Sequence, residues 1–219
     1  VRRIKPDGTI ISPIDFIPVY EKSGLISRLD RYIWEQAAAK LGEWKKAGIN
    51  MSISVNISPK DFYYIDIFNT FVGLIKKYDI EPSNLKIEIT ETTIMSDVPN
   101  LMGELEELRK AGFTLEMDDF GSGYSSLNTL KDINVDVLKV DMGFIKETKN
   151  VKKSRIILAS VIKMAKELNL LIITEGVETE EQVDNLTKLG CDVFQGYYFS
   201  KAIDVNEFEK RYLYRKKAG

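Results

Sequence analysis

Short β-rich runs alternate with amphipathic helical segments along most of this sequence, and this alternation constrains the fold more than any other feature. Runs rich in β-branched residues predict strands at residues 53–58, 85–90, 113–118, 135–141, 170–174 and 191–196. Apolar periodicity and helix-boundary residues predict helices at 27–47, 60–78, 97–111, 151–168, 179–189 and 205–214. Such alternation is typical of parallel βαβ units. An α/β barrel is therefore the first expectation. An open doubly wound sheet is the second, because no glycine-rich phosphate fingerprint follows the first strand.

Composition indicates one globular domain spanning residues 1–219. The chain is 44% hydrophobic and 29% charged, and no linker or low-complexity segment divides it. Its net charge of −2 offers no basic field to a nucleic-acid polymer. The single cysteine, Cys191, excludes an intrachain disulfide and fits a reducing compartment, so a cytoplasmic location is expected. The apolar runs are too short to span a bilayer. Since the sequence does not begin with methionine, we expect it to be a piece of a longer protein, in which any membrane anchor would lie upstream.

Histidine is absent from the sequence, and this absence excludes several kinds of chemistry. Ser-His-Asp and Cys-His catalysis, His-ligated zinc and a histidine general base all require an imidazole. The remaining options are carboxylates, lysines, amide oxygens and hard metal ions.

The predicted strands end on polar residues that can bind a metal ion or a phosphate. These residues are Asn56, Glu88, Asp118, Lys139 with Asp141, Glu175 and Gln195. One buried acid at a strand end is commonly a structural group or a helix cap. Six polar strand ends are harder to explain in that way. In a barrel all the carboxyl ends lie on one face, where the active site of a TIM barrel is built.

Five of the candidate residues supply only oxygen ligands: Asn56, Glu88, Asp118, Asp119 and Glu175. Oxygen ligands suit Mg²⁺ or Mn²⁺. Adjacent like charges such as Asp118 and Asp119 can lie side by side if divalent cations bind near them. Two cations about 3.5–4 Å apart activate water against a phosphodiester. Lys139 could hold that water or neutralise the phosphate charge. Its structural alternative is a strand lysine that pairs with Asp141 or extends to solvent.

Six motifs in order resemble those of the EAL domain family: "SVNIS", "IEITE", "DDFGSGYSSL", "LKVD", "EGVET" and "GCDVFQGYYFS". The resemblance covers nearly the whole chain. It implies a modified TIM (β/α)8 barrel with an antiparallel first strand, here truncated at the N-terminus. It also implies a phosphodiesterase that opens bacterial cyclic di-GMP to linear pGpG with two Mg²⁺ or Mn²⁺ ions. A homodimer and an upstream sensory or GGDEF-type domain are the partners implied.

The same resemblance implies roles for individual residues. Asn56, Glu88, Asp118, Asp119 and Glu175 resemble metal ligands, and Lys139 resembles the residue that positions the attacking water. Glu178, Asp141 and Gln195 resemble residues that support the metals, the water and the substrate. Glu91 resembles the anchor of the loop 120–126, and Arg2 resembles an arginine that contacts a substrate phosphate. The complete set is: Arg2, Asn56, Glu88, Glu91, Asp118, Asp119, Lys139, Asp141, Glu175, Glu178 and Gln195.

The sequence departs from the family pattern at several places. The Glu-Ala-Leu triplet would begin three residues before Val1, so this fragment is expected to lack one metal ligand and its activity as written is in doubt. Ser122 replaces threonine, and Lys201-Ala202 stands where Arg-Pro is common. Glu116 occupies a position where a small residue is expected. If it is buried, it needs a partner or a raised pKa.

Two other functions remain open from the sequence. The first is a receptor that binds cyclic di-GMP without cleaving it, as degenerate EAL domains do, and the departures favour it weakly. The second is an enolase-type barrel enzyme, which also combines Mg²⁺ carboxylates with a lysine base. The adjacent pair Asp118 and Asp119 and the lack of a second obvious base argue against that enzyme.

Overall fold

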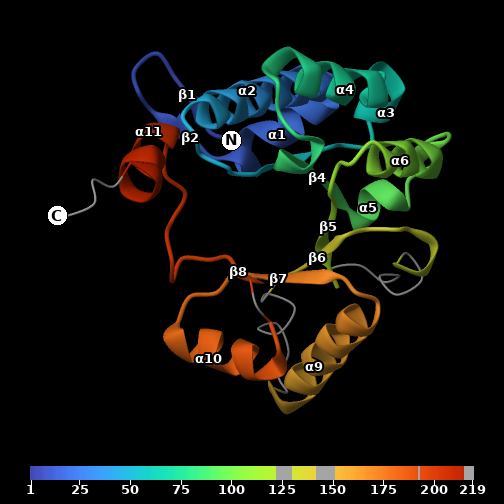
Figure 1. The fold of residues 1–219 in the computed structure, drawn as a ribbon. Helices are drawn as coiled ribbons and strands as arrows, with labels where there is room; N and C mark the ends of the chain where they lie inside the picture. Colours follow the sequence, from blue (N-terminus) through green and yellow to red (C-terminus); the bar gives the residue numbers. More distant parts are fainter. Residues whose placement is uncertain (122–129, 142–150, 192, 215–219) are drawn as a thin grey trace. The chain divides into compact units, whose positions relative to one another are not determined.

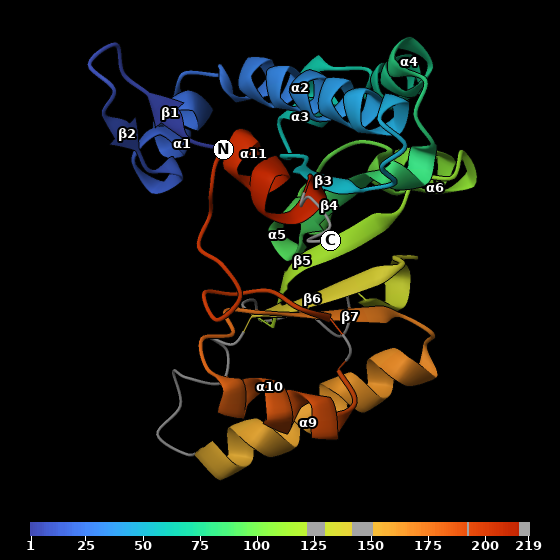
Figure 2. The same ribbon diagram turned by 60° about the vertical axis from the view of Figure 1, so that its left-hand side comes forward.

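The computed structural model describes residues 1–121, 130–141, 151–191 and 193–214 (Figures 1 and 2). The described residues form two compact units. The first contains residues 1–118 and 130–135, and the second contains residues 119–121 and those from 136 onward. Both units contain parallel strands joined by helices, so the predicted α/β class is confirmed. Within the ranges described, no helix has both the length and the apolar character needed to cross a membrane.

The first unit opens with a small antiparallel strand pair and continues with alternating helices and parallel strands. Its elements are β1 (Arg3–Ile4), β2 (Ile10–Ile11), α1 (Pro13–Lys22), α2 (Ile26–Lys46), β3 (Ile53–Asn56), α3 (Asp61–Tyr64), α4 (Ile67–Tyr78), the 3₁₀ turn η1 (Pro82–Asn84), β4 (Leu85–Thr90), α5 (Glu91–Ile94), α6 (Leu101–Lys110) and β5 (Leu115–Phe120), whose last two residues belong to the second unit. Strands β3 and β4 are parallel, as are β4 and β5.

Large apolar side chains form the core of the first unit between its helices and its strands. Trp34 of α2 and Phe71 of α4 are fully buried, with ring centroids 5.0 Å apart. Phe113, just before β5, meets Phe71 edge-on at 5.7 Å. Helices α2 and α4 accordingly run side by side in both views (Figures 1 and 2). This core holds α2 against β3, the strand that carries Asn56.

The second unit repeats the βα pattern. Its elements are β6 (Val137–Asp141), α9 (Val151–Glu167), β7 (Leu171–Glu175), α10 (Glu180–Leu189), β8 (Val193–Phe194), α11 (Val205–Phe208) and the π-helical turn η2 (Glu209–Leu213). Strand β7 pairs in parallel with both β6 and β8. Helices α9 and α10 lie on one side of these strands (Figures 1 and 2). Helix α10 begins with a complete capping box, in which the Thr179 side chain and Gln182 each accept a hydrogen bond from the other residue's backbone N–H.

Three predicted elements need correction. The helix expected at 60–78 is two helices, because the chain turns extended at Ile65 and Asp66 then caps α4 by accepting the Asn69 N–H. The helix expected from Asp97 begins only at Leu101, after Asn100 in the left-handed region. The strand expected at 113–118 is shifted to Leu115–Phe120, so Asp118 and Asp119 lie inside it. Helices α1 and α5 were not predicted from the sequence.

Candidate active site

In the first unit, two predicted ligands lie side by side on the neighbouring strands β3 and β4. The parallel register pairs Asn56 with Glu88, and Asn56 Nδ2 donates a hydrogen bond to Glu88 Oε2 at 3.0 Å. Glu88 is 9% exposed. Because the amide nitrogen of Asn56 is used in this bond, its side-chain oxygen is the atom suited to a cation.

Trp34, which was not among the predicted site residues, fixes the main chain at the same point. Its fully buried indole N–H donates to the carbonyl oxygen of Asn56 at 2.9 Å. Trp34 lies on α2, 22 residues before Asn56. Apolar spacing on α2 predicts a buried Trp34 but does not reveal its polar partner.

Glu116 is completely buried and has two partners in the first unit. Its Oε1 lies 3.0 Å from Lys86 Nζ, and its Oε2 accepts a hydrogen bond from Ser54 Oγ at 2.8 Å. The sequence left open whether Glu116 pairs with a neighbouring residue or perturbs the site. In the structure it pairs with Lys86 and Ser54. The available signal was spacing: Lys86 lies two residues before Glu88, so both side chains share one face of β4.

In the second unit, Lys139 and Glu175 form an ion pair across the parallel strands β6 and β7. Lys139 Nζ lies 2.9 Å from Glu175 Oε1, and the lysine side chain is only 5% exposed. Asp141 is in register with Glu175 at the ends of the same strands. A buried lysine keeps its charge only beside a compensating group. Glu175 supplies that group. Lys139 therefore does not extend to solvent, which was the structural alternative considered for it.

Asp119 provides a second carboxylate for the same region of the second unit. One carboxylate oxygen of Asp119 lies within 4.8 Å of one of Glu175. Asp119 has φ +55°, a left-handed conformation that breaks the alternation of β5. Such conformations are costly for residues other than glycine and concentrate at functional sites. Two converging carboxylates with only oxygen donors fit Mg²⁺ or Mn²⁺.

The remaining predicted residues occupy varied settings. Glu178 and Gln195 are exposed and lie on neighbouring loops. A backbone hydrogen bond joins the loops, in which the Val177 N–H donates to the Gln195 carbonyl at 3.1 Å. Glu91 is 2% exposed at the first position of α5. Arg2 is exposed, and its guanidinium donates to the Val1 carbonyl at 2.7 Å. Residues 122–126 of the loop that Glu91 is expected to anchor, with Ser122, lie outside the described residues.

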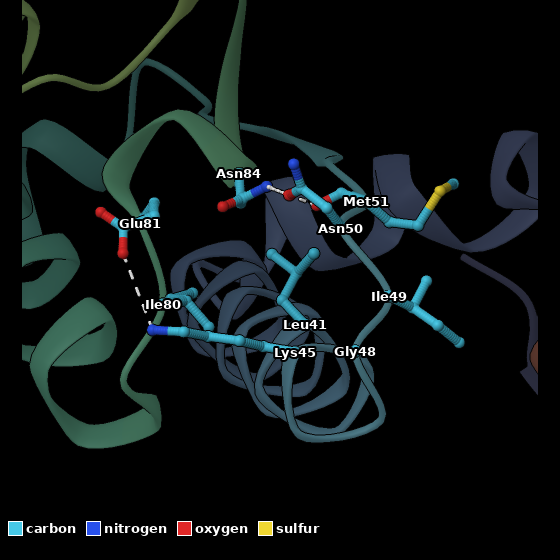
Figure 3. Close-up of a pocket in the computed structure, with 9 residues that line it drawn as sticks. All are labelled: Leu41, Lys45, Gly48, Ile49, Asn50, Met51, Ile80, Glu81 and Asn84. Atoms are coloured by element: carbon cyan, nitrogen blue, oxygen red, sulfur yellow. Dashed lines mark hydrogen bonds and ion pairs between the residues drawn. The ribbon is translucent and has the colours of Figure 1, made fainter.

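A cavity in the first unit lies away from these strand ends. It has a volume of about 270 Å³, and its lining residues come before the first residues of β3 and β4 in the chain. Figure 3 shows Lys45 reaching toward Glu81, 3.7 Å away, and Asn84 donating to Asn50 at 2.9 Å. None of the predicted site residues lines it. This cavity is therefore separate from the predicted site residues.

Comparison with known proteins identifies the family. The EAL domain model matches residues 1–202. The "Cyclic di-GMP phosphodiesterase PdeR" of Escherichia coli is 32% identical over 218 residues, covering 98% of this chain and 33% of that protein. The "Bifunctional diguanylate cyclase/cyclic di-GMP phosphodiesterase MucR" of Pseudomonas aeruginosa is 34% identical over 203 residues, covering 92% of this chain and 30% of that protein. The chain thus spans about a third of the length of these relatives.

A solved structure described as "PaMucR Phosphodiesterase, c-di-GMP complex" resembles the chain with a TM-score of 0.86 and 34% identity, covering 94% of this chain and 84% of that one. This similarity confirms the predicted fold class, the modified barrel of this family. The family match also confirms the resemblance predicted from the six sequence motifs. The chain belongs to the EAL domain family.

Proposed function

We propose that this chain is a phosphodiesterase that hydrolyses cyclic di-GMP to linear pGpG with the help of two Mg²⁺ or Mn²⁺ ions. The observation that carries the proposal is the buried Lys139–Glu175 ion pair, with the Asp119 carboxylate beside Glu175, at the strand ends of an EAL domain. The names of the relatives, and the cyclic di-GMP complex of the solved neighbour, support the choice of substrate.

Five oxygen donors would hold the ions: Asn56, Glu88, Asp118, Asp119 and Glu175. Bound divalent cations would lower the pKa of a water molecule and neutralise charge on the phosphate oxygens. One local feature in each unit supports this proposal. Asn56 orients Glu88 through its amide, and the left-handed backbone at Asp119 sets the direction of that carboxylate.

Lys139 would orient the attacking water. Its ammonium is held by Glu175 at 2.9 Å in a setting that is almost closed to solvent, so its position is defined before substrate binds. Hydrolysis adds one water across one P–O3′ bond. The product carries a 5′-phosphate, and the leaving oxygen takes a proton to become a 3′-hydroxyl.

The other residues complete the proposal in supporting roles. Asp141 and Glu178 would support the water and the metal ligands, and Gln195 and Arg2 would bind the substrate, with arginine suited to its phosphate. Glu91 would anchor the loop after Asp119. A homodimer, an upstream sensory or GGDEF-type domain and a cytoplasmic location also belong to the proposal.

The test is incubation of cyclic di-GMP with the chain, extended upstream to include the Glu-Ala-Leu triplet, in Mg²⁺ or Mn²⁺. Chromatography would follow the formation of pGpG. Lys139→Met, matched in length and without charge, is the control. We expect product from the parent protein and little from the variant. Tight binding of cyclic di-GMP without turnover would replace the enzyme by a receptor.

A further inference from the structure

Four polar side chains gather where α2 passes the turn between β3 and α3. Ser27 and Asp30 come from one face of α2, and Ser58 and Asp61 come from the turn and the start of α3. Asp61 is completely buried, and its Oδ2 accepts the backbone N–H of Ser58 at 2.8 Å. Ser27, Ser58 and Asp30 lie beside Asp61. Asp61 Oδ1 has no hydrogen bond of acceptable geometry within the described residues, and neither do the buried hydroxyls of Ser27 and Ser58. A buried carboxylate oxygen is therefore in need of a donor.

The charges around this cluster do not supply that donor. The negative charge of Glu21 in α1 also raises the pKa of Asp30. Lys60, at the start of α3, donates its ammonium to the carbonyl oxygen of Glu21. Strand β3 has no charged side chain. Neither Glu21 nor Lys60 therefore offsets the repulsion between the carboxyl groups of Asp30 and Asp61. Another interaction must relieve that repulsion.

A proton between the two carboxyl groups relieves it. Two like charges in contact cannot both be stabilised in a partly buried setting, whereas a protonated carboxyl donates a short, strong hydrogen bond to a carboxylate. Burial, followed by the charge of Asp61, raises the pKa of Asp30 to about 8. Burial also raises the pKa of Asp61, although the Ser58 N–H opposes that shift. The pair of carboxyl groups therefore retains one proton at a pH where an ordinary carboxyl has lost it.

Helix α2 is also bonded to the other end of the same segment. Trp34 lies one turn after Asp30, and its indole N–H donates to the Asn56 carbonyl at 2.9 Å. Residues 56–61 are thus held by α2 at both ends, at Asn56 by Trp34 and at Asp61 by Asp30. Since Asn56 in turn orients Glu88, the fixing of this segment reaches a proposed metal ligand.

We propose that Asp30 and Asp61 share one proton, and that this clasp makes Asp30 a positioning residue for segment 56–61 and hence for Asn56. The clasp is independent of the activity proposed above, and only its consequence for Asn56 as a ligand rests on that function. Asp30 itself touches neither a proposed ligand nor the substrate.

Thermal unfolding of the chain against pH tests the clasp. The folded state keeps the Asp30 proton up to a pH near 8, whereas the unfolded state loses it near 4, so stability present at low pH is lost as the pH rises between these values. We expect the Tm of the parent chain to fall, relative to that of Asp30→Asn, by about 2–4 °C per pH unit between pH 5 and 8. The asparagine keeps a donor for Asp61 but does not ionise.

Asp66→Asn is the matched control. Asp66 is exposed, its hydrogen bonds to Asn69 lower its pKa, and asparagine caps a helix equally well. This variant should therefore follow the parent curve over the whole pH range. Parallel curves for the parent and Asp30→Asn would overturn the shared proton.

Hydrogen exchange tests the positioning. The Ile57 amide donates to the Glu88 carbonyl at 3.0 Å. We expect protection of segment 55–61 to fall about tenfold between pH 6.5 and 8.5 in the parent, after correction for intrinsic exchange, and to stay constant in Asp30→Asn. Equal protection in both proteins would reduce Asp30 to a purely local role and refute the inference. So would stabilisation by Mg²⁺ or Ca²⁺ that Asp30→Asn alone abolishes, because a cation would then replace the proton.

Discussion

Each unit of the molecule holds a lysine–glutamate pair across neighbouring parallel strands, and these two pairs differ in which partner is buried. In the first unit, Lys86 and Glu116 are 3.0 Å apart, and their side chains are 22% and 1% exposed. In the second unit, Lys139 and Glu175 are 2.9 Å apart, and their side chains are 5% and 16% exposed. The two distances are nearly equal, but the carboxylate is enclosed in one pair and the ammonium is enclosed in the other.

This difference leads us to expect a structural role for the first pair and a chemical role for the second. Both carboxylate oxygens of Glu116 are occupied, one by Lys86 and one by Ser54, inside the strand. Glu175 is the last residue of β7, is more open to solvent and lies close to Asp119. We therefore expect the first pair to stabilise its sheet, and the second to take part in the proposed reaction.

Removing the lysine of the first pair should have the largest effect on stability. Lys86→Met leaves Glu116 buried with an uncompensated charge, and breaking a buried pair in this way costs about 3–5 kcal/mol. Urea unfolding would measure the loss. Glu116→Met should cost much less, because Lys86 can reach solvent, and the double variant should recover most of the stability. A loss below about 1 kcal/mol for Lys86→Met would show that Glu116 is compensated by other groups.

Removing the Asp119 carboxylate, which lies near Glu175 in the second unit, should weaken metal binding. Asp119→Asn keeps a residue type that tolerates the left-handed backbone, so it tests the charge alone. Calorimetry with Mn²⁺, on the upstream-extended chain, should show affinity about 100-fold lower, equivalent to about 2.7 kcal/mol. Glu116→Gln is the control from the first region, and its Mn²⁺ affinity should stay close to that of the parent. An equal loss in both variants would end the distinction between the two regions.

Backbone crowding gives a third contrast between the units. A Cβ at Gly196 would lie 2.0 Å from the Val177 carbonyl oxygen, whereas a Cβ at Gly73 in α4 would meet no atom within 4 Å. Gly196→Ala should therefore destabilise by about 1–3 kcal/mol and disturb the loops of Gln195 and Glu178. Gly73→Ala should stabilise by about 0.5–1 kcal/mol, because alanine favours a helix interior. Chemical denaturation of both variants decides the matter, and a neutral Gly196→Ala would contradict the tight approach.

The sequence was a good guide where local chemistry decides the structure. Strands such as Leu85–Thr90 and Leu171–Glu175 are short, rich in isoleucine and bounded by polar residues, and they were predicted within a residue. Helix α10 was predicted at 179–189 and spans Glu180–Leu189, with Thr179 as its N-cap and Gly190 as its C-cap. The break at Asp66 was missed because apolar periodicity continues across it, although the capping side chain interrupts the helix.

Partners across the sheet could not be predicted from the sequence in the same way. The strand-end residue types were visible, but the Lys86–Glu116 bond joins residues 30 apart, and the Trp34–Asn56 bond joins residues 22 apart. Their formation depends on strand register and on how α2 packs, which are fixed only when the tertiary structure forms. The left-handed backbone of Asp119 was hidden for the same reason, since Asp119 lies within a strand and is not a glycine.

The most direct test compares the two lysines in one assay. Formation of pGpG from cyclic di-GMP would be followed for the upstream-extended parent, Lys139→Met and the Lys86→Met/Glu116→Met double variant, at equal concentrations of folded protein. We expect Lys139→Met to lower kcat by about 10²–10³-fold, in line with the loss of an electrostatic catalytic group. The double variant should retain activity within about tenfold of the parent, which is less than about 1.4 kcal/mol. Equal losses in both variants, or full activity in Lys139→Met, would contradict the assignment of the second pair to the reaction.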